Sequence, residues 1–329
     1  MNKPQKMRSL FVLIGVLVII IATISCGIRF LDSAVFSKQE YSESTEKRKT
    51  ITVDGVDYFP RQDITVFLAM GIDKEGKVES SNSYNNDGEA DVISVIVFND
   101  EDKTVTILNL NRDTMVEIPR RGIGGKKTGT YIGQLALSHT YGDGLEESCE
   151  NTRETVSKLL KGVNIDYYIA ANMDAVGFIN DAVGGVKVNV TDDFSAVDGS
   201  IPMGEVTLKG QQAVHFVRLR KEVGDQLNIS RMGRQEEYVK GFIEALNEKL
   251  ETESNFAYDF YKAAEGYFVT DCSFNAFSGM FERFADYELK EIVTPEGENT
   301  MGKKFIEFYL DEDKFEDIIL NIFYAKKNK

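Results

Sequence analysis

The chain has 329 residues, of which 42% are hydrophobic and 28% are charged, which suits one large or two small globular domains with a real core. Its formal net charge of −15 excludes a general attraction to nucleic acid, so a site for an anionic ligand requires a local cluster of basic residues. Three scattered cysteines and two histidines form no zinc-binding pattern, while a pairing of Cys149 with Cys272 stays open.

The N-terminal region predicts a membrane anchor. Residues 10–28 carry no charge and are long enough to cross a bilayer, and three basic residues precede them within residues 1–9. The positive-inside rule then places residues 1–9 in the cytoplasm and everything after residue 28 outside the cell membrane. A cleaved signal peptide and lipidation at Cys26 are the alternatives, and both also place the following chain outside the membrane.

Residues 29–50 are polar and predict a stalk, and residues 51–329 predict one extracytoplasmic domain that opens with β-strands. The first signal is a hairpin over Ile51–Phe59, with Asp54 and Gly55 at its turn. A continuous apolar strand then ends at Asp73. Two further strands, "ADVISVIVFN" and "KTVTILNLN", pair as a hairpin across "DEDK".

The middle of the chain alternates between helices and strands. Apolar spacing predicts a helix over about Asn151 to Lys161, followed by the strand "IDYYIAAN", the helix "MDAVGFINDAV" and the strand "VKVNV". Short joints between the last three elements predict a parallel strand pair with a right-handed crossover. The expected fold is α/β, a mixed central sheet flanked by helices in three layers (α/β/α), preceded by one transmembrane helix.

Two helices follow, a short one near Lys209 to Arg218 and a long one from about Arg231 to Leu250 with Ser230 as its N-cap. Arg231 and Arg234 would then lie in the first turn. There the positive end of the helix dipole disfavours cations unless an anion binds.

Basic residues gather around the start of this long helix. Five bases and two acids lie between Arg218 and Arg234, a local charge of +3. Arg231, Arg234 and Gln235 share one helix face, and Arg218 and Arg220 precede them. Because the planar guanidinium grips phosphate in bidentate fashion, the segment predicts a phosphate-binding site. The alternative is a set of surface salt bridges with the chain's many acids.

Three aspartates stand at strand ends: Asp73, Asp91 and Asp113, the last directly after Arg112. Ligands of open α/β sheets collect at strand ends. Carboxylates beside a phosphate repel it unless a divalent ion lies between them, and Mg²⁺ (or Mn²⁺) is held by one or two carboxylates with phosphate oxygens. The alternative is that the aspartates only cap or turn the chain.

From about Asp63 to the C-terminus the chain resembles the LytR–CpsA–Psr family of cell-wall glycopolymer ligases. The similar segments are "LAMGID", "DVISVIVFN", "LNRDT", "GVNIDYYIAANMDAVGFINDAVGGVKVNV" and "FVRLRK…SRMGRQ". One position departs from the family pattern, which usually has an arginine two residues before the second aspartate. Here that position is Glu89.

The resemblance implies an extracytoplasmic phosphotransferase. Such an enzyme moves a teichoic acid or capsular glycopolymer from a polyprenyl-pyrophosphate carrier at the membrane to a peptidoglycan hydroxyl. The resemblance implies Asp73 and Asp91 as Mg²⁺ ligands, and a catalytic role for Arg112, Asp113 and Arg231. It also implies pyrophosphate contacts from Arg112, Arg218, Arg220, Arg231, Arg234 and Gln235.

The sequence alone leaves the role of Asp113 and the type of reaction open. Asp113 either orients Arg112 or activates the acceptor hydroxyl. A pyrophosphohydrolase would use the same residues with water as the acceptor, and a non-catalytic polyprenyl-phosphate binder or regulator would keep only the binding residues. Outward topology and acidic charge both argue against a nucleic-acid partner.

Overall fold

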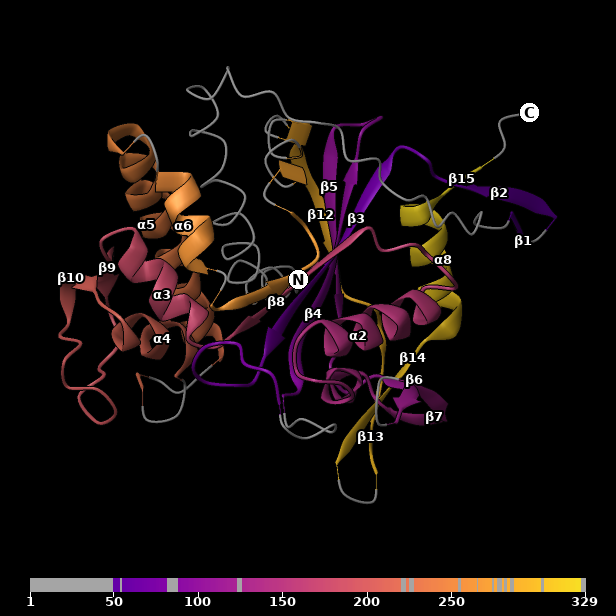
Figure 1. Ribbon diagram of the computed structural model, residues 1–329, viewed down its shortest axis with the longest axis horizontal. Coiled ribbons are helices and arrows are strands. Elements are labelled where there is room, and N and C mark those ends of the chain that lie inside the picture. The colour runs from indigo at the N-terminus through magenta and orange to yellow at the C-terminus, as the bar shows by residue number, and fades with distance from the viewer. Residues whose placement is uncertain are drawn as a thin grey trace. The chain divides into compact units, whose positions relative to one another are not determined.

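The fold is known from a computed structural model (Figure 1). The structure describes residues 50–53, 55–81, 88–122, 126–219, 223–224, 228–253, 256–264, 266–273, 275–276, 280, 283–284, 287–302 and 305–326.

The first half of the described chain is rich in strands: β1 (Ile51–Val53), β2 (Val56–Pro60), β3 (Ile64–Ile72), β4 (Ala90–Asn99), β5 (Thr104–Leu110), β6 (Met115–Arg121), β7 (Lys127–Gln134), the 3₁₀ helix η2 (Leu135–Thr140), α2 (Glu146–Leu159) and β8 (Tyr167–Asn172). The second half alternates more: α3 (Ala175–Ala182), β9 (Val186–Val190), β10 (Gly204–Leu208), α4 (Gln211–Arg218), α5 (Asn228–Thr252), α6 (Phe256–Ala264), β11 (Phe268–Thr270), β12 (Glu288–Val293), β13 (Gly297–Met301), β14 (Ile306–Leu310), α8 (Glu312–Phe323) and β15 (Tyr324–Lys326).

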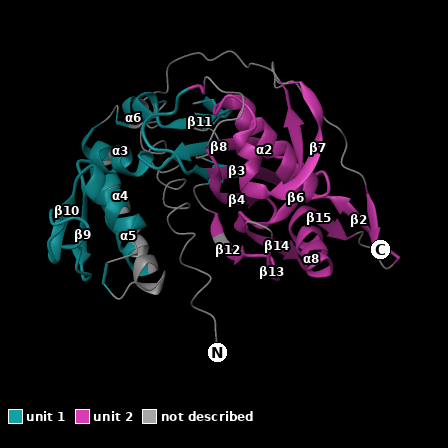
Figure 2. Ribbon diagram, turned by 90° about the horizontal axis from the view of Figure 1, so that it is seen from below, with its two compact units in different colours: residues 1–30, 71–79, 170–285 teal, residues 31–70, 80–169, 286–329 magenta. Residues whose placement is uncertain are grey.

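The described residues form two compact units, shown in separate colours in Figure 2. The first unit takes residues 71–79 and 170–285, and the second takes residues 50–70, 80–169 and 286–326. The chain therefore passes between the units more than once. The expectation of one domain over residues 51–329 remains a prediction.

The main sheet has the strand order β11-β8-β3-β4-β5-β12. Strands β4 and β5 pair antiparallel, with Ile93 opposite Leu110, while β5 and β12 pair parallel. The sheet is therefore mixed, and the predicted β4–β5 hairpin is confirmed. The hairpin of β1 and β2 is confirmed as well, since Val53 pairs with Val56.

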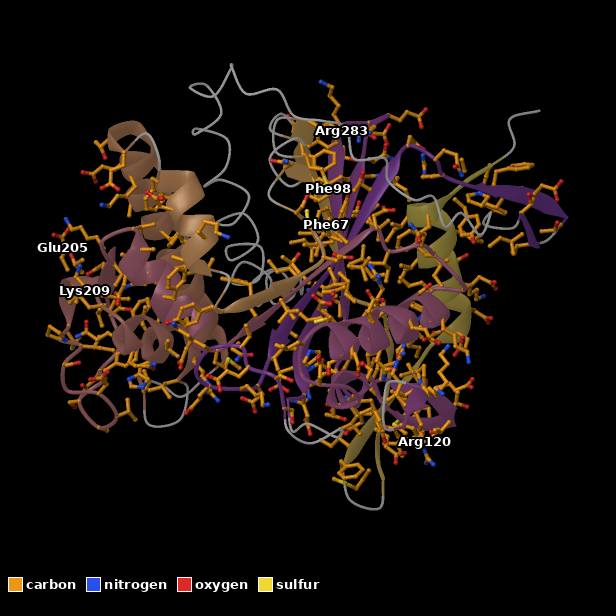
Figure 3. All side chains as sticks on the ribbon, viewed as in Figure 1. Phe67, Phe98, Arg120, Glu205, Lys209 and Arg283 are labelled. Carbon is orange, nitrogen blue, oxygen red and sulfur yellow. The ribbon has the colours of Figure 1, made fainter. Side chains whose placement is uncertain are left out.

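Apolar side chains from the sheet form the core of the second unit. Val66 and Leu68 of β3 and Val95 of β4 are completely buried. The ring of Phe67 meets that of Phe98 edge to face, with centroids 5.9 Å apart, and Figure 3 labels both near the sheet. Since β4 is buried over six successive residues, its continuous apolar run indicated a core strand correctly.

The predicted parallel pair around the helix α3 is wrong. The strand "VKVNV" is β9, and it pairs antiparallel with β10 in a separate two-stranded sheet. Its alternate residues are buried and exposed, as expected for a strand with only one covered face. Gly241 lets the long helix α5 approach this strand closely, because a Cβ at Gly241 would lie 2.2 Å from the Lys187 carbonyl oxygen.

The long helix α5 also begins earlier than predicted. It starts at Asn228, so Ser230 lies inside its first turn and is not the N-cap. Arg231 is then the fourth residue of the helix and Arg234 the seventh. The earlier start moves Arg234 out of the first turn, where the helix dipole acts most strongly.

The predicted anchor, residues 10–28, lies outside the described residues, as does the predicted stalk apart from residue 50. Within the part of the chain that the structure describes, no helix is both long and apolar enough to cross a bilayer. Among the described residues, Cys149 and Cys272 are both buried, and the structure places no disulfide between them.

Candidate functional site

Arg112 projects from the tight turn between β5 and β6. The Asn111 side-chain oxygen accepts a hydrogen bond from the Asp113 backbone N–H at 2.9 Å. The Thr114 hydroxyl and N–H both donate to the Asn111 carbonyl oxygen, at 2.6 and 3.0 Å. These bonds within four residues fix the turn, as asparagine commonly does at strand ends.

Three carboxylates surround the Arg112 guanidinium, and we call these four residues the Arg112 cluster. One terminal nitrogen donates to Asp91, and the other donates to Glu89 at 2.5 Å. The Nε atom lies 3.7 Å from Asp113 Oδ1. The Arg112 side chain is one-third exposed, at 33%, so this is a partly open site and not a buried structural ion pair.

The Arg112 cluster carries a formal charge of −2, because three carboxylates meet one guanidinium. Glu89 occupies the position where the resemblance led us to expect an arginine, and it contacts the guanidinium directly. An arginine there would change the formal charge of the cluster by two. The charge at this turn therefore differs from the one that the resemblance led us to expect.

Asp113 is held from two sides. Gln134, the last residue of β7, donates from Nε2 to Asp113 Oδ1 at 2.7 Å and to the Ile306 carbonyl oxygen at 2.9 Å. Together with the contact to Arg112 Nε, these bonds fix the direction of the carboxylate. Gln134 could not be predicted from the sequence, because a glutamine between a strand and a short helix has no characteristic pattern.

In the first unit, Asp73 and Arg218 form an ion pair. Asp73 follows the end of β3 and Arg218 ends α4, and the nearest nitrogen and oxygen are 3.4 Å apart. Both side chains are about half exposed, at 49% and 46%. The structure thus brings together two residues predicted for different roles, one for a metal and one for pyrophosphate.

Arg234 is buried, with 4% of its surface exposed. Its guanidinium donates to the Phe216 carbonyl at 2.8 Å, to the Leu219 carbonyl and to Asp192, and it stacks over the Phe194 ring. These protein acceptors give Arg234 a structural role beside the predicted pyrophosphate contact, which remains a prediction. Asp192 could not be predicted from the sequence, because it lies in a polar loop that contains several acidic residues.

Arg234 and Asp192 also border a cavity of about 310 Å³ in the first unit. Its walls come from β9, the loop after it, α4 and α5; the lining residues are Asn189, Thr191, Asp192, Phe216, Gly233, Arg234 and Glu237.

The remaining predicted site residues are not placed by the structure. Arg220 lies outside the described residues, and for Arg231 and Gln235 only the helical backbone is described. Among the residues with described positions, no three His, Cys, Asp or Glu side chains are arranged so that they could together hold a metal ion. Asp73 and Asp91 are hard oxygen donors of the kind Mg²⁺ prefers, but each is engaged by an arginine.

Two sequence relatives of this chain carry the same name, and a solved structure is similar to it in fold. The polyisoprenyl-teichoic acid–peptidoglycan teichoic acid transferase TagU of Bacillus subtilis (strain 168) is 27% identical over 257 residues, 78% of this chain and 73% of that protein. The protein of the same name from Enterococcus faecalis is 27% identical over 277 residues, covering 84% and 82%. The crystal structure of B. subtilis TagV matches the fold with a TM-score of 0.55 at 21% identity, over 80% of this chain and 96% of that one.

The profile of the LytR_cpsA_psr family matches residues 29–321, nearly the whole chain. The match spans both compact units and includes the segments that carry Arg112, Asp73 and Arg218. The chain therefore belongs to the LytR_cpsA_psr family.

Proposed function

We propose that this protein is a membrane-anchored extracytoplasmic phosphotransferase. It takes a glycopolymer of teichoic acid or capsular type from a polyprenyl-pyrophosphate carrier and joins it to a peptidoglycan hydroxyl. Residues 10–28 anchor it in the cell membrane with residues 1–9 in the cytoplasm. Family membership supports the reaction class, and the TagU relatives are named as teichoic acid transferases that act on peptidoglycan.

The observation that carries the proposal is the Arg112 cluster. A guanidinium at a strand end, partly exposed and fixed by a rigid turn, is suited to stabilise negative charge that develops during phosphoryl transfer. Its carboxylate partners keep the fork oriented before substrate arrives. Arg218, Arg220, Arg231, Arg234 and Gln235 remain the predicted further contacts to the pyrophosphate.

In the proposed reaction, an acceptor hydroxyl attacks the glycan-bearing phosphorus of the donor. The bond from that phosphorus to the bridging oxygen breaks, and polyprenyl phosphate leaves. Arg112 stabilises the leaving phosphate, and a carboxylate of the cluster takes the proton from the hydroxyl. We assign Asp113 the orienting role, because it is already bound by Gln134 and lies beside Arg112 Nε.

Mg²⁺ is the proposed cofactor, with Mn²⁺ as its substitute. The charge of the cluster supports this, because three carboxylates would repel a pyrophosphate approaching Arg112. Asp73 and Asp91 are the proposed ligands. When bound, the ion would neutralise phosphate oxygens and polarise the phosphorus.

Replacing Arg112 tests the proposal in the full chain, purified in detergent with a lipid-linked oligosaccharide, peptidoglycan and Mg²⁺. We expect Arg112→Ala to lower the release of polyprenyl phosphate by at least about 100-fold, because one preorganised donor to the developing charge is lost. Arg120→Ala is the matched control, since Arg120 is an exposed arginine on β6 of the same unit that stacks 5.0 Å above Tyr131 (Figure 3).

The control should retain wild-type release. Wild-type release by Arg112→Ala would contradict the assignment of Arg112.

A further inference from the structure

The helix α2 buries a polar face. Ser148, Asn151 and Thr152 are fully buried, and Thr155 is 1% exposed. Burying such groups costs free energy unless each finds a hydrogen-bond partner, and an amphipathic helix ordinarily buries apolar residues instead. The partners of these side chains therefore indicate what the face is for.

Two of the buried side chains hold the 3₁₀ helix η2. Asn151 donates from Nδ2 to the Ser138 carbonyl oxygen at 2.8 Å. The Ser138 hydroxyl lies 2.7 Å from the Leu135 carbonyl oxygen and 3.1 Å from the Thr152 hydroxyl. Ser138 is itself fully buried, so the hydrogen bonds that join η2 to α2 are shielded from water.

The same short helix holds the backbone on both sides of Asp113. The Ala136 N–H donates to the Arg112 carbonyl oxygen at 2.9 Å, and the Leu135 N–H donates to the Thr114 carbonyl oxygen at 2.8 Å. Directly before the helix, Gln134 binds the Asp113 carboxylate at 2.7 Å. Residues 134–136 thus each donate a hydrogen bond to one residue of the turn at 112–114.

At its far end η2 reaches the segment that carries Glu89. His139 Nδ1 lies 2.9 Å from the Gly88 carbonyl oxygen, and His139 is 1% exposed. A carbonyl oxygen can only accept, so Nδ1 carries the hydrogen and Nε2 is the acceptor. Nε2 lies 3.8 Å from the buried Cys149 thiol, which extends the network back to α2.

We propose that α2 and η2 form a clamp that positions the Arg112 cluster, with Gln134 and His139 as its positioning residues. Gln134 sets the direction of Asp113 and, through it, of the Arg112 fork. His139 fixes the backbone next to Glu89. Neither residue needs to touch substrate, and the effect on turnover rests on the proposed function, whereas the effect on the two segments does not.

Hydrogen–deuterium exchange of the full chain in detergent, without substrate, tests the clamp directly. Gln134→Met keeps the length of the side chain and removes its donors, so we expect backbone amides of residues 111–116 to exchange several-fold faster. His139→Leu should have the same effect on residues 88–93. His139→Asn should restore wild-type exchange there, because the asparagine amide nitrogen occupies the position of Nδ1.

Turnover provides the second readout. We expect Gln134→Met to lower kcat for polyprenyl phosphate release by about 10-fold or more with KM little changed, because the cluster is misaligned and not removed. Gln62→Met is the matched control. Gln62 is an exposed glutamine of the same unit that makes only a local bond to Pro60 among the described contacts.

The clamp would be overturned if residues 111–116 of Gln134→Met and residues 88–93 of His139→Leu both exchanged at the wild-type rate. It would also be overturned if Gln134→Met exchanged faster but kept the wild-type kcat for polyprenyl phosphate release. If His139→Leu fails to fold, the exchange of Gln134→Met and His139→Asn still decides the question. A wild-type chain that releases no polyprenyl phosphate would overturn the proposed function, while the exchange result would still judge the clamp.

Discussion

At the scale of single residues, the balance of charge around Arg112 sets the chemistry available to this protein. One guanidinium shared by Glu89, Asp91 and Asp113 is preorganised, but it is also shielded by excess negative charge. An anionic substrate is attracted to Arg112 only if the excess negative charge of the cluster is neutralised. Glu89 is the member of the cluster whose removal should matter most for affinity, because it stands where the family usually has a base.

We expect Glu89→Gln to lower KM for the lipid-linked donor about fivefold, which corresponds to ~1 kcal/mol of relieved repulsion. The glutamine oxygen can still accept from Arg112, so the turn should stay intact. Steady-state kinetics with a lipid-linked oligosaccharide measure the change. An unchanged or higher KM would show that Glu89 does not repel the donor.

Glu101→Gln serves as the matched control for that variant. Glu101 is an exposed glutamate of the same unit that pairs with Arg61 at 3.3 Å, and its neutralisation should leave KM at the wild-type value.

Burial of the Cys272 thiol should make the stability of the protein depend on pH under alkaline conditions. Burial, with a smaller contribution from the charge of Asp271, raises the pKa of the Cys272 thiol from 9.0 to about 12. Because the folded pKa lies above the unfolded one, the associated stability is present below pH 9 and is lost as the pH rises toward 12.

We therefore expect the free energy of unfolding to fall with pH between 9 and 11 more steeply in the wild type than in Cys272→Ala. The difference should approach ~1.4 kcal/mol per pH unit, the value for one proton. Denaturant titrations at several pH values measure both slopes. Equal slopes would show that the thiol ionises as easily in the folded chain as in the unfolded one.

At the scale of elements, Arg234 connects three parts of the first unit. It extends from α5 and binds the carbonyl oxygens of Phe216 and Leu219 at the end of α4, and Asp192 after β9. The bond to Leu219 holds the residue that directly follows Arg218. Arg234 thereby stabilises the backbone from which the predicted phosphate-binding arginines extend.

Removing the carboxylate partner of Arg234 should be costly. We expect Asp192→Ala to lower the free energy of unfolding by about 3 kcal/mol, because it leaves a guanidinium that is 4% exposed without its counter-charge. Denaturant unfolding followed by circular dichroism measures the loss. Asp193→Ala is the control: Asp193 is exposed and should cost less than about 1 kcal/mol.

If Asp192→Ala also lowered the free energy of unfolding by less than about 1 kcal/mol, Arg234 would not need Asp192 as its acceptor. That result would contradict the structural role assigned to the pair.

Local pattern predicted the elements well and their long-range partners poorly. The apolar run of β4 and the "DEDK" turn predicted the β4–β5 hairpin, because a short turn leaves only the antiparallel neighbour within reach. The pairing of β9 was missed, because β10, "GEVTL", is only five residues long and has just two apolar side chains, those of Val206 and Leu208. The start of α5 was misplaced because serine is a common N-cap but also tolerates the first turn.

At the candidate site, too, local pattern predicted some residues, whereas residues that act through long-range contacts were missed. Strand ends predicted Arg112, Asp113 and Asp91 as neighbours of a site, and the structure places both aspartates against the Arg112 guanidinium. Gln134 and His139 could not be found this way, because their contacts depend on the path of a 3₁₀ helix and not on any spacing in the sequence.

At the scale of the whole molecule, the proposed anchor gives the enzyme access to its donor. A domain tethered at the membrane surface meets a membrane-bound lipid carrier at a much higher effective concentration than a freely diffusing one would. The proposed reaction also requires two products in fixed proportion, the joined glycopolymer and the released polyprenyl phosphate.

Analysis of both products is the most direct measurement of the central claim. The full chain is incubated with a radiolabelled lipid-linked oligosaccharide, Mg²⁺ and purified peptidoglycan. The glycan bound covalently to peptidoglycan is then compared with the polyprenyl phosphate released. Phosphotransfer predicts equal amounts of the two products, with the glycan joined through a phosphodiester. Release of polyprenyl phosphate without any glycan on the peptidoglycan would contradict it and indicate hydrolysis of the donor instead.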